Sequence, residues 1–185
     1  VAACHLPTFN SHCIESYIHR IPYLAECFLY SNDDTYISQR IDPSDFFQLS
    51  ETPPDVAAAT GQTIEVKLKL RGWTMKKHTK GKSMHQVAVH NYFAICKHLE
   101  MVPIHPEHHV TPMLKTMMVQ AEIFFADAWS NSRTTFRGAG NIVPIYAATS
   151  LAYHLGRGTL VRDGADPLQK LYIGGNTFKS TSLRK

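Results

Sequence analysis

The chain has 185 residues, of which 44% are hydrophobic and 18% are charged. This length supports one sizeable core and is too short for two ordinary domains, and the hydrophobic share excludes a mainly disordered chain. The formal net charge of +4 is too small and too scattered to indicate a nucleic-acid partner, although it suits a phosphorylated ligand. Every apolar run is shorter than the ~20 residues that a membrane-spanning helix needs.

The sequence opens with Val1 and shows neither an initiator methionine nor a signal peptide. We therefore expect a fragment or a processed chain that works in the cytoplasm, with at most peripheral contact with the inner face of the membrane. The four cysteines show no paired spacing, which favours buried thiols over disulfides and a reducing compartment, and they lack the spacing of a zinc site. They are Cys4, Cys13, Cys27 and Cys96.

The N-terminal third predicts a helix, a strand and a short helix. Apolar residues recur at helical spacing over residues 14–21, with Ser11 placed to cap the helix and Pro22 to end it. Residues 27–31 form a short apolar run that predicts a buried strand. It ends in Asn-Asp-Asp at residues 32–34, and the carboxyl ends of strands are where α/β proteins bind ligands. Residues 42–47 predict a turn that opens a short helix.

The remaining segments alternate between strands and helices. Strict alternation of charged and apolar residues predicts a half-exposed strand over residues 65–71. Loops are expected over 49–63, 78–83 and 103–112, helices over 87–99, 113–129 and 142–155, and one further strand over 171–173. The alternation indicates an α/β fold, a Rossmann-like or glycosyltransferase-A-like core fragment with short strands and flanking helices. So few strands cannot complete a doubly wound sheet, which supports the expectation of a single partial catalytic domain over residues 1–185.

Adjacent carboxylates after the first strand are the first candidate for chemistry. Asp33 and Asp34 could hold Mg²⁺ or Mn²⁺, because these ions take oxygen ligands and bridge to substrate phosphates. Without further evidence, a solvated turn explains the same pair.

A histidine loop before a helix is the second candidate. His108, with His109 beside it, could act as a general base because the pKa of histidine lies near neutrality, and Lys115 could balance phosphate charge. Two surface histidines are the competing interpretation. The third candidate is Arg137, which is followed by small residues and could clamp a phosphate, or could be an exposed side chain beside a turn.

The order of these segments resembles the Stealth family of sugar-phosphate transferases. The similarity is carried by the stretch from Leu6 through Pro22, by Phe-Leu-Tyr-Ser-Asn-Asp-Asp at 28–34 and by Asp-Pro-Ser-Asp-Phe-Phe at 42–47, which resemble its second conserved block. Its third block has a His, a Pro four residues on, a basic residue seven on and a later Arg. His108, Pro112, Lys115 and Arg137 fit that spacing.

The resemblance implies roles for individual residues. Glu15 and Asp34 match the acidic catalytic positions, Asp33 is the neighbouring acid, His108 matches the catalytic histidine and Arg137 the phosphate-binding arginine. Asn10, His12, Asn32 and Lys115 are expected to bind substrate, and Asp33 and Asp34 to hold Mg²⁺ or Mn²⁺. The family's first block would precede Val1, its last block is not recognisable after Gly156, and Asn141 stands where many members have Asp.

The function that the resemblance implies is transfer of a sugar 1-phosphate from a nucleotide sugar, of the UDP-GlcNAc type, to a hydroxyl of an acceptor glycan in capsule or exopolysaccharide synthesis. The expected partners are therefore the nucleotide-sugar donor and the glycan acceptor. Two alternatives stay open: a metal-dependent glycosyltransferase that transfers the sugar alone, and a non-enzymatic carbohydrate-binding module.

Overall fold

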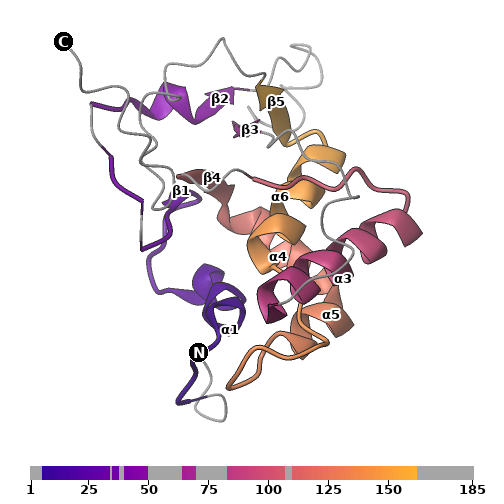
Figure 1. Cartoon of the computed structure of the whole chain (residues 1–185). Coiled ribbons are helices and arrows are strands. Elements are labelled where there is room, and N and C mark those ends of the chain that lie inside the picture. Colours follow the sequence, from indigo (N-terminus) through magenta and orange to yellow (C-terminus); the bar gives the residue numbers. More distant parts are fainter. Residues whose placement is uncertain are drawn as a thin grey trace, which may run out of the picture.

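The computed structural model describes residues 6–33, 35–37, 40–49, 64–69, 83–106 and 110–161. Short strands are interspersed among helices along these segments, as Figure 1 shows. In chain order they are α1 (Ser11–Glu15), η2 (Ile18–Arg20), β1 (Cys27–Tyr30), η3 (Pro43–Asp45), β2 (Phe47–Leu49), β3 (Ile64–Lys69), α3 (Met84–His98), β4 (Thr111–Leu114), α4 (Lys115–Phe124), α5 (Ala126–Asn131), α6 (Pro144–His154) and β5 (Gly158–Val161). This is the mixed α/β architecture with short strands and flanking helices that the sequence predicts.

The strands form two small sheets. In one sheet β1 and β4 pair antiparallel, so that Phe28 lies opposite Met113. In the other, β3 lies between β2, which is antiparallel to it, and β5, which is parallel. Val66 of β3 therefore lies opposite both Phe47 and Gly158. Both sheets join segments that are far apart in the sequence.

The helices and the sheets bury two adjoining apolar clusters. The larger cluster lies among α3, α4, α5 and α6, and its bulkiest members are Trp129 and Tyr92, which are almost completely buried. The smaller cluster includes Val66 and Leu68 of β3 and Leu114 of β4. Figure 1 shows the pair of β1 and β4 between the three-stranded sheet and helices α4 and α6.

Local signals explain why several helices begin where they do. The side chain of Ser83 accepts a hydrogen bond from the backbone N–H of Gln86, whose side chain in turn accepts from the backbone of Ser83, so a capping box starts α3. Asp42 caps η3 in the same reciprocal way. Pro144 occupies the first turn of α6, as predicted, where its missing N–H costs no helical hydrogen bond.

The single helix predicted over residues 14–21 is wrong. Asn10, not Ser11, caps α1, and the helix ends at Glu15 before the separate turn η2. The carbonyl of Ser16 accepts from the indole N–H of Trp129 instead of continuing the helix. Tertiary contacts therefore override the helical spacing, and Ile14, placed on the apolar face by the pattern, is half exposed.

The region around Pro112 also differs from the prediction. Pro112 was expected in a loop, but it lies in β4 opposite Leu29. A two-stranded sheet has an outer edge on each strand, and an edge position tolerates a proline that cannot donate to the ladder. The helix expected over 113–129 begins at Lys115 and is divided at Phe125, whose backbone leaves the helical conformation.

Other expectations are confirmed with small shifts. The strand over 65–71 is observed as β3, and the helices over 87–99 and 142–155 as α3 and α6. The strand β1 is only half buried, contrary to expectation, and β5 was missed. The strand expected over 171–173, and nearly all of the loops expected over 49–63 and 78–83, lie outside the described residues.

The cysteines that the structure describes are free thiols, as expected. Cys13 and Cys96 are buried free thiols and Cys27 is a half-buried one, while Cys4 lies outside the described residues. Burial raises the pKa of Cys96 to about 11, so this thiol stays protonated at neutral pH. Among the described helices, none is long and apolar enough to pass through a bilayer.

Candidate functional site

A cavity of about 450 Å³ opens where α1, the end of β1, α3 and the loop before α6 meet. Its lining is rich in polar and ionisable side chains. Those used below are Ser11 and Glu15 from α1, Tyr30, Asn32 and Asp33 from β1 and the turn after it, His85 from α3, Arg137 from the loop, and Tyr146 from α6. Residues more than 100 positions apart in the sequence therefore share one pocket.

The start of α1 is fixed by Asn10, which is completely buried. Its side-chain oxygen accepts from the backbone N–H of His12 at 3.1 Å and so caps the helix. Its amide donates to the carbonyl of Ser132 at 3.1 Å and to Oδ1 of Asn141 at 3.1 Å. Asn10 thus ties the first turn of α1 to both sides of the loop that carries Arg137.

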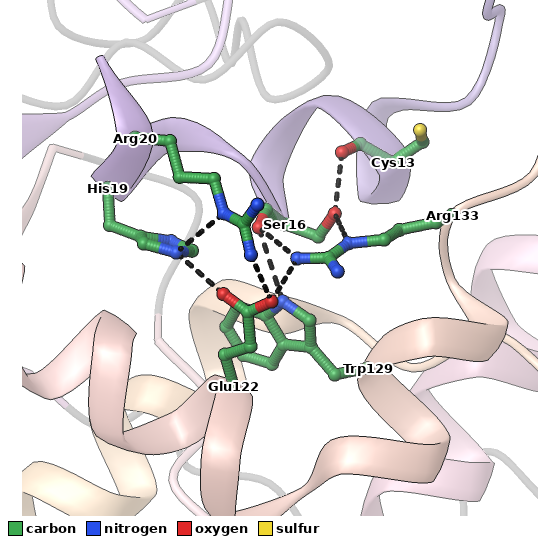
Figure 2. A network of polar contacts seen from close by, with 7 residues as sticks. All are labelled: Cys13, Ser16, His19, Arg20, Glu122, Trp129 and Arg133. Atoms are coloured by element: carbon green, nitrogen blue, oxygen red, sulfur yellow. Dashed lines mark hydrogen bonds and ion pairs between the residues drawn. The ribbon is translucent and has the colours of Figure 1, made fainter. Parts of the chain in front are cut away.

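The end of α1 is tied to the same region through the backbone of Ser16. Its carbonyl accepts from the indole of Trp129 at 3.2 Å and lies 3.4 Å from a guanidinium nitrogen of Arg133. The side chain of Arg133 also donates to the hydroxyl of Ser16 at 3.3 Å. Figure 2 shows these contacts converging beneath the helix. Glu15, which precedes Ser16, is thereby held against the segment that leads to Arg137.

One carboxylate organises the other half of that network. Oε1 of Glu122 accepts from Arg20 at 2.6 Å and from Arg133 at 2.5 Å, and Oε2 lies 2.7 Å from Nε2 of His19 (Figure 2). Although burial raises the pKa of Glu122, the hydrogen bond and charge of Arg133, with Arg20 and His19, hold it below its ordinary value. Glu122 therefore stays ionised and joins α4 to η2.

Glu15 is the most strongly perturbed carboxyl group of the pocket. Burial raises its pKa to about 7, against weaker opposing effects of the Tyr30 hydroxyl and the Arg137 charge. The hydroxyl of Tyr30 lies 3.2 Å from Oε1 of Glu15 and 3.0 Å from Oδ1 of Asn32. The other carboxyl oxygen of Glu15 is buried without a hydrogen-bond partner among the described residues. Such a group can accept a proton near neutral pH.

Arg137 supplies positive charge to the same pocket. It is exposed, and a guanidinium nitrogen donates to the hydroxyl of Ser11 at 2.8 Å. That contact leaves most of its donors available for a ligand, because a guanidinium carries five N–H groups. Asp33 and Asn32 lie on the side of the cavity formed by the turn after β1.

The structure brings some of the predicted residues together and places others elsewhere. Glu15, Asn32, Asp33 and Arg137 line the cavity. Asp34, His108 and His109 lie outside the described residues, so their roles remain predictions. The ammonium group of Lys115 lies 3.5 Å from the carbonyl of Leu24, and Lys115 is absent from the described lining of the cavity. Asn10 and His12 are completely buried behind the cavity wall.

Tyr30 and His85 are among the pocket residues that sequence reasoning missed. Tyr30 could have been found, because residues two apart in a strand point to the same side and Tyr30 precedes Asn32 by two. Nothing in the local sequence marks His85, which begins α3 and enters the cavity only through tertiary packing.

The cavity offers some of the oxygen ligands that a hard divalent cation prefers. The carboxylate of Asp33, the amide oxygen of Asn32 and the orphaned oxygen of Glu15 are the ligand types that Mg²⁺ and Mn²⁺ prefer. Within the described segments, no cluster of three or more His, Cys, Asp or Glu residues could hold a metal alone. These residues therefore fit a Mg²⁺ ion that keeps several waters and shares substrate phosphates.

Comparisons with known proteins found a matching family model and several curated relatives. Residues 1–54 match the family model described as Stealth protein CR2, conserved region 2. The chain is 26% identical to an exopolysaccharide phosphotransferase, CpsY, of Mycobacterium leprae over 96% of this chain and 31% of that protein. It is 31% identical to an exopolysaccharide phosphotransferase of Nocardia farcinica over 80% of this chain and 27% of the relative.

A shorter stretch is more closely related to a capsule enzyme. Over 44 residues, 24% of this chain, the identity to the capsular polysaccharide phosphotransferase cps1A of Actinobacillus pleuropneumoniae is 52%, covering 12% of that relative. The chain spans about a third of the length of the relatives that match along most of it, for example 31% of CpsY. The similarity therefore concerns one part of these proteins.

Proposed function

Because the chain belongs to the Stealth family, we propose that it forms part of an enzyme that transfers a sugar 1-phosphate from a nucleotide sugar to a hydroxyl of an acceptor glycan in capsule or exopolysaccharide synthesis. The observation that carries this proposal is the cavity in which Glu15, Asp33 and Arg137 converge. It combines a proton acceptor, an oxygen ligand and a phosphate-binding cation. A donor of the UDP-GlcNAc type is the finer proposal.

In the reaction that we propose, an oxygen of the acceptor attacks the phosphorus that carries the sugar. The bond from that phosphorus to the bridging oxygen of the pyrophosphate breaks, and the nucleoside monophosphate leaves with the electron pair. A phosphodiester then links sugar and acceptor, and the proton of the hydroxyl passes to a base on the protein. Positioning and neutralisation of charge account for most catalysis of this type.

Glu15 is the base that the described residues support. Its pKa of about 7 provides both an ionised form that accepts the proton and a protonated form that holds it. The Tyr30 hydroxyl, 3.2 Å from Glu15, can turn towards Asn32 when Glu15 becomes protonated. His108 stays an alternative base, and Asp34 stays an expected partner of Asp33. His108 and Asp34 both lie outside the described residues.

Arg137 would bind the phosphates directly, and Asp33 would bind them through a metal ion. Arg137 matches phosphate oxygens through paired N–H groups, and its contact with Ser11 fixes its direction. Asp33, with Asn32 beside it, would hold Mg²⁺ or Mn²⁺ with Asp34. A bound ion of this kind neutralises phosphate charge and assists the leaving group.

The test is to identify the nucleotide released. The purified protein is incubated with labelled UDP-sugars, an acceptor glycan and Mg²⁺, and the products are separated by chromatography. We expect UMP together with a phosphodiester-linked product. Release of UDP would instead identify a glycosyltransferase that moves the sugar alone. Glycan binding without nucleotide release would identify a binding module.

Variants assign the roles within the cavity. Glu15→Gln should lower the rate about 10²–10⁴-fold, the usual effect of losing a general base, while donor binding is kept. Arg137→Gln should weaken donor binding about tenfold or more, because a charged hydrogen bond is lost. Glu100→Gln, an exposed change outside the cavity, is the control. Unchanged rates in both site variants would contradict the proposed assignment.

A further inference from the structure

Two histidines from different helices meet at the wall of the cavity. His12 of α1 is completely buried, and its Nε2 lies 3.1 Å from Nδ1 of His85 at the start of α3. His85 is half buried and lines the cavity, whereas His12 lies behind it. Burying a histidine completely is costly unless its ring nitrogens form hydrogen bonds. Here its ring contacts His85, the one histidine among the described residues that lines the cavity.

The contact restricts where protons can reside. Burial lowers the pKa of His12 to about 3, with the charges of His85 and Arg137 acting in the same direction. His12 is therefore neutral at physiological pH. A neutral imidazole has one donor nitrogen and one acceptor nitrogen, so the facing nitrogens of His12 and His85 share a single proton. Any second proton that the pair takes up goes to His85.

The remaining groups around the cavity make such uptake sensitive to an anion. Arg137 stands on the same cavity wall as Ser11, to which it is hydrogen bonded. Of the described lining residues, Glu15 from α1, Asp33 and Tyr30 from the β1 end, and Tyr146 from α6 are the others that can carry charge or a proton. An entering pyrophosphate adds negative charge beside His85, which favours its protonated form.

We propose that His85, held in position by His12, is a phosphate-binding residue of this cavity that takes up one proton from solvent when a pyrophosphate enters. The proposal rests on the proposed function, since it concerns the pyrophosphate of the donor. The added proton binds to Nε2 of His85, the nitrogen that does not face His12. Nδ1–H of His85 then donates to Nε2 of His12, so His12 carries its own proton on Nδ1.

The first measurement follows the histidine rings directly. The protein is labelled with ¹⁵N in histidine, and inorganic pyrophosphate is added at pH 8, where an ordinary histidine is neutral. We expect the His85 ring nitrogens to shift to the imidazolium pattern while His12 shows the Nδ1–H tautomer. Calorimetric titrations in two buffers of different ionisation enthalpy should show uptake of about one proton per pyrophosphate bound.

Variants separate charge from structure. His85→Gln should bind pyrophosphate about tenfold more weakly and take up no proton, because the charged donor is lost. His85→Lys should restore affinity, because it supplies a charged donor, without restoring the proton uptake that His85 contributes. His98→Gln, an exposed change in the last turn of the same helix, should behave like the wild type. His12→Gln should lower proton uptake while the cavity still binds the anion through Arg137.

The outcomes distinguish this inference from the proposed function. If pyrophosphate binding requires Arg137 but is unchanged in affinity and proton uptake in His85→Gln, the inference is overturned and the proposed function stands. If the wild type does not bind pyrophosphate at all, both are overturned. A neutral His85 in the pyrophosphate complex of the wild type would also overturn the inference.

Discussion

Burial acts on two ionisable side chains of α1 in opposite directions. It raises the pKa of Glu15 to about 7 and lowers that of His12 to about 3, because in both cases the neutral form is favoured away from water. Among the described lining residues, the charged side chains of Asp33 and Arg137 are exposed. Burial thus disfavours charge on both α1 side chains but not on these two.

The raised pKa of Glu15 predicts how stability changes with pH. Because the folded pKa lies above the ordinary value of 4.5, the folded state holds its proton more tightly, and stability is lost as pH rises from about 4.5 to about 7. Glu15→Gln mimics the protonated form and escapes this loss. We expect the variant to gain stability relative to the wild type over that range, on the order of 3 kcal/mol at most above pH 7.

Urea unfolding at pH 4, 6 and 8 measures this difference in the free energy of unfolding. Glu100→Gln replaces an exposed glutamate and serves as the control, for which we expect no comparable trend. A Glu15→Gln difference that is constant across this pH range would show that Glu15 is not held in its neutral form by burial.

At the level of helices and strands, the ion pairs of Glu122 hold η2 against α4. Arg20, Arg133 and His19 surround this carboxylate, so replacement by Gln removes its charge and leaves one acceptor oxygen for three donors. We expect Glu122→Gln to lower the free energy of unfolding by about 1–3 kcal/mol at pH 7. Since the pKa of Glu122 is lowered from 4.5, the difference should shrink as pH falls below about 4.5.

Chemical unfolding at pH 7 and pH 3 tests this expectation. Asp127→Asn, at an exposed position in the first turn of α5, removes a nearby carboxylate that is not part of the network and should have a smaller effect. If Glu122→Gln is equally destabilising at both pH values, packing and not charge explains its contribution.

The parallel pairing of β3 and β5 depends on a glycine. A Cβ atom at Gly158 would lie 2.7 Å from Cδ1 of Leu68 and 3.3 Å from the backbone nitrogen of Tyr153. We therefore expect Gly158→Ala to destabilise the protein by about 1–3 kcal/mol through overpacking. At Gly138 an added Cβ meets only a side-chain nitrogen of Asn141 at 3.8 Å, so Gly138→Ala is the matched control in thermal unfolding. Equal melting temperatures for the two variants would contradict the close approach at Gly158.

Sequence predicts the helices and strands whose causes are local. The apolar spacing of α3 and the proline at the start of α6 act within a few residues, and both helices were predicted. In contrast, β4 contains Pro112, and β5 is recognisable only through its pairing with β3. The early end of α1 depends on Trp129 and Arg133. Such long-range partners are not visible in a local pattern.

At the scale of the whole molecule, the two apolar clusters share their helices. Met117 of α4 belongs to the smaller cluster and Met118 to the larger one. In α6, Ala152 and Leu151 divide in the same way. Neither cluster can lose these helices without exposing the other, so they should unfold together.

We therefore expect a single unfolding transition for the described part of the chain. The fluorescence of Trp129, measured in a Trp73→Phe background, reports the larger cluster, and far-UV circular dichroism reports all helices and strands. The two signals should give the same urea midpoint, and Gly158→Ala, which acts in the smaller cluster, should shift both. A fluorescence midpoint that does not move with this variant would show that the clusters unfold independently.

Part of the candidate site was expected from the sequence. Asp33 and Arg137 were candidates from their local sequence, the resemblance singled out Glu15, and all three line one cavity. The local sequence could not decide their roles, because an acidic pair and a lone arginine each have ordinary explanations. The pairing of His12 with His85 needs the packing of α1 against the start of α3, which no local pattern encodes.

The ties between Asn10 and residues 132–141 have a consequence for protein synthesis. The ribosome releases α1 long before residues 132–141, with which Asn10 forms hydrogen bonds. Strands β1 and β3 likewise precede their partners β4 and β5. Contacts of such high sequence separation slow folding, and exposed strand edges favour aggregation in the meantime. The emerging N-terminal part must therefore remain soluble without its partner strands until Val161 has been made.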